Sequence, residues 1–136
     1  MKPPKAPDNP VQDETVPLAA SLRLQVLKTR PMFLAAARAR RQATASMMVQ
    51  ARKRNTGEAS GIRVGFTCSQ KVGNAVARNR AKRRLREAAR LVLPQHGQDG
   101  WDYVLIGFRD KTADRGFQDL QQDLIYALSK LHMKRP

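Results

Sequence analysis

Apolar residues recur at every second position in two neighbouring segments, residues 45–53 and 62–69, and this spacing predicts two β-strands. Each strand would bury one face, because successive side chains of a strand point to opposite sides. The positions expected on the buried faces are Met47, Val49 and Ala51 in the first strand, and Ile62, Val64, Phe66 and Cys68 in the second. Turn residues lie between them, at Asn55-Thr56-Gly57 and Ser60-Gly61, so we expect the two strands to pair as a hairpin.

A third strand and three helices complete the pattern. Residues 101–108 are almost continuously apolar, as expected of a central strand that is covered on both faces. Helical spacing or helix-favouring composition is found in three segments, residues 29–41, 75–93 and 116–131. Pro31 suits the first turn of the first helix, and Pro94 is expected to end the second.

The predicted order is helix, strand, strand, helix, strand, helix. It places the chain in the α+β class as a small two-layer α/β sandwich, with room for one further short strand. Residues 21–133 would form a single domain, because 136 residues do not suffice for a second sizeable core. Residues 1–20 contain five prolines among acidic residues and have little to bury, which predicts a disordered tail.

The charge balance indicates a polyanionic partner. Lys and Arg number 26 against 11 Asp and Glu, so the net charge is +15, and nucleic acid or an anionic membrane would neutralise it. No apolar run approaches the roughly 20 residues that span a bilayer, and the residues after Met1 contain no apolar signal core. With the single Cys68, which we expect to fill the core, these features favour a cytoplasmic protein.

The second helix concentrates this charge. Residues 78–86 hold six cations in nine positions, five of them arginines. At 100° per residue, one apolar stripe is formed by Ala77, Ala81, Leu85, Ala88 and Val92, while the opposite side carries Arg80, Arg83, Arg86 and Arg90. An ordinary solvated face would mix signs, because like charges one turn apart repel. The excess of arginine favours bidentate contacts with phosphates.

The turn before this helix is a second candidate for binding phosphate. Gly73 permits a tight turn and Asn74 can cap the helix, so that free backbone N–H groups would point outward beside Lys71.

Residues 62–88, which include Gly73-Asn74 and Arg78-Asn79-Arg80, closely resemble the signature of the bacterial ribonuclease P protein family. The resemblance extends more loosely over residues 22–131. It implies that the second and third predicted strands are parallel and joined through the basic helix by a left-handed crossover, against the usual handedness. It also implies a protein subunit that binds a catalytic RNA and the 5′ leader of precursor tRNA, and so promotes the endonucleolytic maturation of tRNA 5′ ends.

The resemblance assigns residues to two surfaces. The contacts with the catalytic RNA would be Lys71, Asn74, Arg78, Asn79, Arg80, Lys82, Arg83 and Arg86. A cleft between the first helix and the sheet would receive the leader, with Phe33 lining it and Met48, Gln50 and Arg63 on the sheet. Two positions differ from the family pattern: Ala37 replaces a second aromatic residue, and Gln70 stands where a basic residue is common.

We expect no catalytic or metal site within the protein itself. Cleavage of a phosphodiester by side chains needs a pair of acid/base groups or clustered carboxylates that hold metal ions. His96 and His132 are expected to be ordinary surface residues, and Asp119 and Asp123 to share a solvent-facing side of the last helix. The resemblance implies instead that Mg²⁺ is held through the partner RNA and that the protein is monomeric in the holoenzyme.

Two other function classes share the basic composition. A ribosomal or other structural RNA-binding protein would also present a basic helix, but it would need no cleft for a single strand. A membrane-active cationic module would need a strongly apolar face opposite the charges, whereas the stripe of this helix is mainly alanine. Dependence of binding on a 5′ leader would separate the first alternative from a ribonuclease P subunit.

Overall fold

A five-stranded mixed sheet forms the centre of the computed structural model, which describes residues 24–55, 57–58 and 60–133. The tail expected over residues 1–20 lies outside these ranges. Across the sheet the strand order is β2-β5-β6-β4-β3. The strands are β2 (Leu24–Val26), β3 (Arg40–Ala43), β4 (Met47–Lys53), β5 (Ile62–Cys68) and β6 (Trp101–Gly107). As predicted, the apolar strand β6 is central, parallel to β5 and antiparallel to β4.

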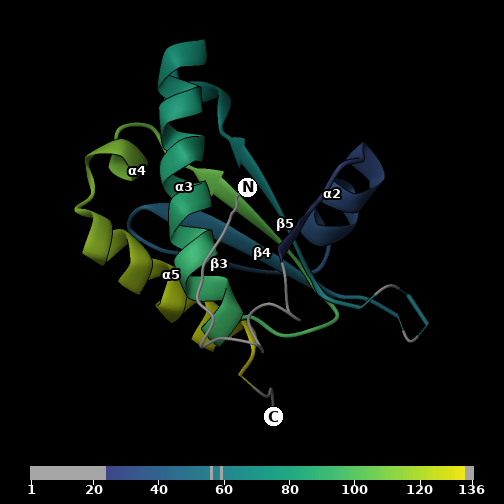
Figure 1. The fold of residues 1–136 in the computed structure, drawn as a ribbon. Coiled ribbons are helices and arrows are strands. Elements are labelled where there is room, and N and C mark those ends of the chain that lie inside the picture. Colours follow the sequence, from purple (N-terminus) through teal and green to yellow (C-terminus); the bar gives the residue numbers. More distant parts are fainter. Residues whose placement is uncertain (1–23, 56, 59, 134–136) are drawn as a thin grey trace, which may run out of the picture.

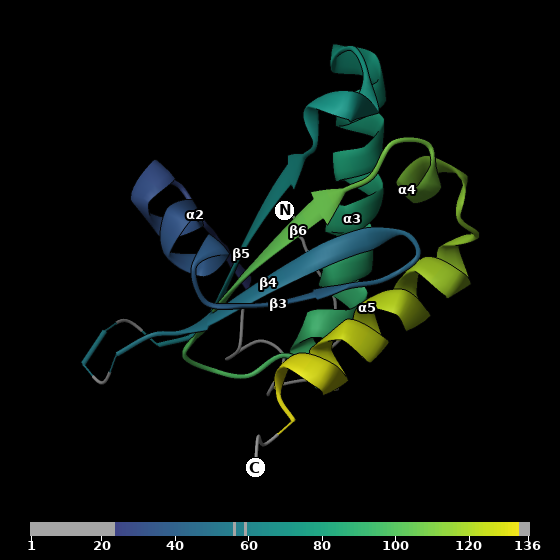
Figure 2. The ribbon, with the colours of Figure 1, turned by 180° about the vertical axis from the view of Figure 1, so that it is seen from behind.

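Helices cover both faces of the sheet (Figures 1 and 2). The helical elements are α2 (Arg30–Ala37), a 3-10 turn η1 (Gln70–Val72), α3 (Ala75–His96), the short α4 (Lys111–Asp114) and α5 (Phe117–Leu131). Helices α3 and α5 form the expected second layer, and their buried residues pack with Tyr103 and Leu105 of β6. Val104 points to the other face, where it packs with Ala36 of α2.

The connection between β5 and β6 has the left-handed sense that the family resemblance implies. The two strands are parallel neighbours, and α3 links them. In Figure 1, α3 lies in front of the sheet, and β6 lies to the left of β5 when both strands point upward. The chain therefore moves to the left as it passes from β5 over α3 to β6.

The expected hairpin of β4 and β5 is wrong, because β6 lies between them. The alternation predicts the buried face of β4 correctly, but of the four positions predicted in β5 only Ile62 and Val64 are buried, whereas Phe66 and Cys68 are half-buried. In neither strand does the alternation specify the neighbour. β6 can take the central place because its residues are buried on both faces, and both flanking strands then pair with it through backbone hydrogen bonds. The sheet also has two short outer strands, β2 and β3, where the sequence pattern allowed for one further short strand without placing it.

Helix boundaries also differ from the expectation at two places. α2 begins after Thr29 as predicted but ends at Ala37, because residues 40–43 pair with β4 as β3. α3 continues through Pro94 to His96, with the N–H of Gly97 donating to the carbonyl of Leu93 at 2.8 Å. A proline near the end of a helix loses one backbone bond, and here the last turn persists despite that loss.

Candidate nucleic-acid interface

Helix α3 separates an apolar seam from an arginine-rich surface, as its sequence predicts. The residues buried against the sheet and α5 are Ala81, Leu85, Ala88, Ala89, Val92 and Leu93. The exposed cations of its first three turns are Arg78, Arg80, Arg83 and Arg86, which we call the arginine ridge. Asn79 is exposed beside them, and Lys82 is half-buried. The structure therefore brings all the predicted catalytic-RNA contacts of α3 onto its first three turns.

Few of the residues that the structure describes neutralise the arginine ridge. Among the described residues, Arg78, Arg80 and Arg83 take part in no ion pair. Glu87 pairs instead with Arg90, whose hydrogen bond lowers the pKa of the glutamate below its ordinary value. An uncompensated row of guanidinium groups on one helix favours association with a polyanion.

Arg84 has a different role from its neighbours. Its guanidinium donates to the backbone carbonyls of Thr112, at 3.2 Å, and Arg115. It also lies over the ring of Phe117, 5.9 Å from the centroid. Arg84 therefore connects α3 to the segment that contains α4 and the start of α5. This structural role agrees with the prediction, in which Arg84 is not among the RNA contacts.

The turn before α3 has the conformation that its sequence predicts. Gly73 has a φ of +123°, a region that residues with a Cβ rarely adopt. Asn74 caps the helix, its Oδ1 accepting from the N–H of Ala77 at 3.0 Å. Lys71 is exposed next to this helix start. The positive end of α3 and the Lys71 ammonium therefore lie together, beside the arginine ridge.

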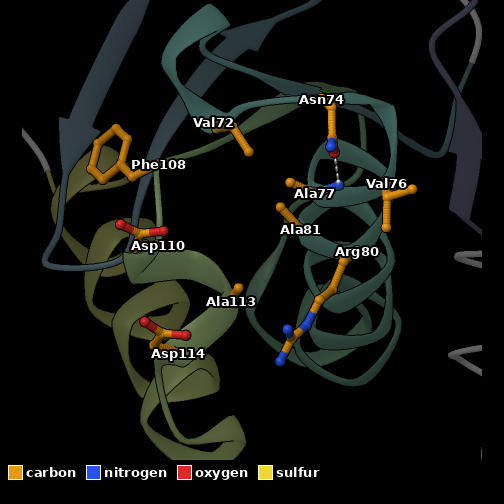
Figure 3. Close-up of a pocket in the computed structure, with 10 residues that line it drawn as sticks. All are labelled: Val72, Asn74, Val76, Ala77, Arg80, Ala81, Phe108, Asp110, Ala113 and Asp114. Carbon is orange, nitrogen blue, oxygen red and sulfur yellow. Dashed lines mark hydrogen bonds between the residues drawn. The ribbon is translucent and has the colours of Figure 1, made fainter.

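A pocket of about 300 Å³, which we call the α3–α4 slot, opens beside the first turns of α3. Figure 3 shows Val72, Ala77, Ala81 and Ala113 pointing into the gap between the two helices. Arg80 flanks this gap from the α3 side. Asp110 and Asp114 flank it from the other side, at the two ends of α4. The carboxylates of the slot were not among the residues expected from sequence, since Asp110 and Asp114 form no recognisable motif.

A second pocket, of about 430 Å³, lies between α2 and the sheet and corresponds to the predicted leader cleft. Of the four residues expected there, Phe33 and Gln50 line it, whereas Met48 and Arg63 do not. The other lining residues are Arg30, Leu34, Ala37, Phe66, Thr67 and Val104. We call this pocket the α2 cleft.

Gly65 determines how Phe33 lies in the α2 cleft. A Cβ at position 65 would come within 2.5 Å of the Phe33 ring, closer than any real contact. The absence of a side chain at Gly65 therefore lets the ring lie directly on the sheet. Ala37 lines the same cleft and is exposed, so the position where the family pattern has a second aromatic leaves open space.

Arg63 is held by a buried carboxylate instead of lining the cleft. Its guanidinium donates twice to Asp102, at 2.8 and 3.0 Å, and this pairing raises the pKa of Arg63 above its ordinary value. Arg54 donates to the same carboxylate at 2.6 Å, and Arg52 lies 3.5 Å from it. Asp102 is fully buried. The sequence places Arg63 on the expected sheet face, but it does not reveal that Asp102 binds it.

Phe66 connects the α2 cleft with the arginine ridge. It is one of the cleft-lining residues, and the guanidinium of Arg86 lies 5.3 Å from the centroid of its ring. An aromatic ring that carries a cation on its face is a typical cation–π contact. The ring of Phe66 packs on the α3 face of β5, and the same residue also lines the α2 cleft. The two predicted surfaces therefore lie on either side of β5 and share this residue.

Two expectations about isolated polar residues are wrong. His132 is half-buried, with its Nε2 2.7 Å from the hydroxyl of Tyr103, and burial lowers its pKa below the ordinary value. Asp123 does not face solvent freely, because it accepts hydrogen bonds from Ser46, at 2.6 Å, and from Arg115. His96 and Asp119 are exposed, as expected.

In the part of the chain that the structure describes, no group of three His, Cys, Asp or Glu side chains is placed to hold a metal ion. Nor is any helix there long and apolar enough to span a bilayer.

Comparisons with known proteins point to one family. A family model described as Ribonuclease P matches residues 22–132. The chain is 68% identical over 121 residues to the Ribonuclease P protein component of Ruegeria pomeroyi, which covers 89% of this chain and 97% of the relative. It is 47% identical over 111 residues to that of Caulobacter vibrioides, which covers 82% of this chain and 73% of the relative.

Solved structures show the same fold. The RNase P protein of Staphylococcus aureus superposes with a TM-score of 0.63 at 26% identity, covering 79% of this chain and 94% of that one. The RNase P protein of Thermotoga maritima gives a TM-score of 0.59 at 24% identity, covering 78% and 94%.

Proposed function

The chain belongs to the ribonuclease P protein family, whose known role is tRNA 5′ processing, and from this premise we propose how it acts. It binds the catalytic RNA of ribonuclease P through the arginine ridge and the Lys71–Asn74 turn. It receives the 5′ leader of precursor tRNA in the α2 cleft. In this way it promotes endonucleolytic cleavage at the tRNA 5′ end, as a monomer within a cytoplasmic holoenzyme.

One observation carries this proposal: an unneutralised arginine ridge and an aromatic-lined cleft share Phe66, whose ring lies next to Arg86. A folded RNA is bound mainly through its phosphates, whereas a single strand is bound by stacking its bases on aromatic rings. The two RNA classes would then meet the protein on either side of β5, with Phe66 common to both places. A purely structural RNA-binding protein would need the ridge but not the cleft.

The protein would contribute binding and charge, and not the chemical step. The Mg²⁺ ions that assist phosphodiester cleavage would be held through the RNA, with the protein supplying cations that lower the repulsion between RNA and substrate. We therefore expect the protein to reduce the Mg²⁺ concentration that cleavage requires and to raise the affinity for substrates that carry a leader.

Reconstitution tests this function. Precursor tRNA is incubated with a bacterial ribonuclease P RNA at low Mg²⁺, with and without the full-length protein, and the rate of 5′ cleavage is measured. We expect the protein to stimulate cleavage and to favour precursor tRNA over mature tRNA in binding. Binding of the RNA without stimulation, and with no preference for the leader, would support the structural alternative.

A further inference from the structure

The α3–α4 slot differs from the phosphate-binding surface around it. Arg80 lies on one side, but Asp110 and Asp114 lie on the other (Figure 3). Carboxylates are scarce in this chain, with 11 acidic residues against 26 basic ones. Two of them beside the helix that would meet RNA repel phosphates at that place. Arg109 and Lys111 are exposed next to Asp110, but they do not line the slot. Within the slot, the α4 side therefore presents hydrogen-bond acceptors and suits a group that donates hydrogen bonds.

The interior of the slot is largely apolar. Between the charged sides, most of its lining residues are small or apolar, and Asn74 is the one uncharged polar residue among them. The small or apolar residues are Val72, Val76, Ala77, Ala81, Phe108 and Ala113. Its volume of about 300 Å³ is at the lower end of the range for small-molecule sites. An apolar gap with polar groups at its edges suits a flat ring that carries its hydrogen-bonding groups on the rim. A nucleobase is such a ring, and RNA-binding proteins commonly take up bases that are unstacked from the RNA.

The carboxylates narrow the choice of base. A carboxylate accepts two hydrogen bonds side by side. Guanine presents two adjacent donors on its Watson–Crick edge, N1–H and the 2-amino group. Adenine, cytosine and uracil each place an acceptor beside their donor. Asp110 is exposed, so its carboxylate is accessible to a ligand, and its Oδ2 lies 3.8 Å from the Nε of the exposed Arg109.

We propose that the α3–α4 slot binds an unstacked guanine base of the ribonuclease P RNA, with the Asp110 carboxylate accepting from its Watson–Crick edge. Arg80 then contacts the phosphate or sugar of the same nucleotide. This site rests on the function proposed above and adds a base-specific contact to an interface otherwise built on phosphates. It explains why acidic residues stand beside the arginine ridge.

The proposal is tested by removing the negative charge of Asp110 and measuring whether the affinity for RNA rises or falls. Asp110→Asn raises the net charge by one and, through electrostatics alone, would strengthen RNA binding. Asn has nearly the same size and shape as Asp, and the site is exposed, so the variant is expected to fold. We expect it instead to weaken binding of the ribonuclease P RNA by about ten-fold or more. Asp119→Asn makes the same charge change at an exposed site on α5 and is expected to bind as tightly as the unmodified protein, or slightly more tightly.

Base identity is tested with inosine, which lacks the 2-amino group. Ribonuclease P RNA is transcribed with inosine in place of a small fraction of its guanosines. The RNA molecules that bind the protein are separated from those that do not, and the inosine positions in each set are mapped. We expect at least one position where inosine disfavours binding to the unmodified protein but not to Asp110→Asn. Ala113→Leu, which fills the slot without changing charge, should abolish the same signal.

The failures of the two proposals are distinguishable. If the unmodified protein does not bind the RNA, the proposed function fails. If it binds, but Asp110→Asn binds as tightly as Asp119→Asn, or no inosine position separates the proteins, the guanine site alone is overturned. A loss of binding in Asp110→Asn that varies with Mg²⁺ and has no inosine signal would also overturn it, and would indicate a metal ion in the slot.

Discussion

Asp102 is the only carboxylate that is buried within the described part of the chain, and its environment shows how single residues stabilise this basic protein. Arg54, with 1% of its side chain exposed, and Arg63, with 14%, both bind it. Arg54 also donates to the backbone carbonyls of Trp101 and Gly61, so one cluster connects β6 to the segments on either side of the β4–β5 loop. The carboxylate therefore compensates arginines that could not otherwise be buried.

Replacing Asp102 with Asn tests this role. The substitution preserves the shape of the side chain but removes the buried negative charge that Arg54 and Arg63 bind. Removing one partner of a buried ion pair costs about 3–5 kcal/mol, so we expect a loss of that order in the free energy of unfolding, measured by urea denaturation. Asp119→Asn, an exposed matched control, should change it little. An equal effect of the two substitutions would contradict the assignment.

His132 gives the fold a dependence on pH. Burial, and then the nearby Arg40, lower its pKa below the ordinary value of 6.5. The unfolded chain then binds the proton more readily than the folded one. The contribution to stability is therefore complete above about pH 6.5 and is lost as the pH falls through the lowered pKa of the folded state.

We expect His132→Gln to remove this part of the pH dependence. The free energy of unfolding, measured from about pH 7.5 to about pH 5, should fall less steeply in the variant than in the unmodified protein. His96→Gln is the control, because His96 is exposed. Parallel curves for His132→Gln and the unmodified protein would show that this histidine does not contribute.

Ala37 offers a gain of function at the α2 cleft. It is exposed and lines the cleft near Phe33, at the position where the family pattern has an aromatic residue. Stacking of one base on an aromatic ring contributes about 1–3 kcal/mol. We therefore expect Ala37→Phe to raise the affinity of the holoenzyme for precursor tRNA about five-fold or more, without changing the affinity for mature tRNA.

The matched control is Ala39→Phe, since Ala39 is exposed but does not line the cleft. The affinity of the holoenzyme is compared for precursor tRNA, which carries a leader, and for mature tRNA, which does not. If Ala37→Phe and Ala39→Phe change these affinities equally, the leader does not occupy the α2 cleft.

At the scale of elements, α3 shows what its sequence can and cannot predict. The apolar seam, the exposed arginines, the Asn74 cap and the Gly73 turn follow from local spacing, because helical geometry fixes which residues share a face. The role of Arg84 depends on carbonyls of residues 112 and 115, far along the chain. Such a partner is set by tertiary packing and leaves no local signal.

In the strands, too, local sequence predicts some features, whereas tertiary packing determines the others. The apolar composition of β6 predicts its central place, and alternation predicts the buried face of β4 and of the first half of β5. Their order is not predicted, because a strand with one apolar face can pair with any neighbour of matching register. β2 and β3 are short, three and four residues, and are defined by pairing with β5 and β4 instead of by their own pattern.

The cap of α3 can be tested apart from RNA. Asn74→Ala removes the acceptor for the N–H of Ala77, and loss of an N-cap typically costs about 1 kcal/mol. We expect that loss in thermal unfolding without RNA, and recovery of most of it in Asn74→Ser. Asn79→Ala deletes the same type of side chain from the exposed face of α3 and should not destabilise the fold. Equal stability of the Asn74→Ala protein and the unmodified protein would contradict the cap.

At the scale of the whole molecule, the net charge of +15 is distributed so that a defined part of it would meet RNA. Each neutralised phosphate lowers the slope of log K against log salt concentration by about 0.7–0.9. If about six to eight phosphates are contacted, the slope for ribonuclease P RNA should be about −4 to −7. If the protein attracted RNA only diffusely, this slope would depend on the total charge of the protein and not on which arginines it carries.

The central claim, that the arginine ridge binds the RNA, is tested most directly by comparing two triple variants of equal charge. One replaces Arg78, Arg80 and Arg83 with Ala, and the other replaces Arg38, Lys53 and Lys130, exposed cations outside α3. The affinity for ribonuclease P RNA is measured over a salt series. We predict that the ridge variant alone binds far more weakly, with a slope flattened by about two to three units. Equal affinities and slopes for the two variants would contradict the account.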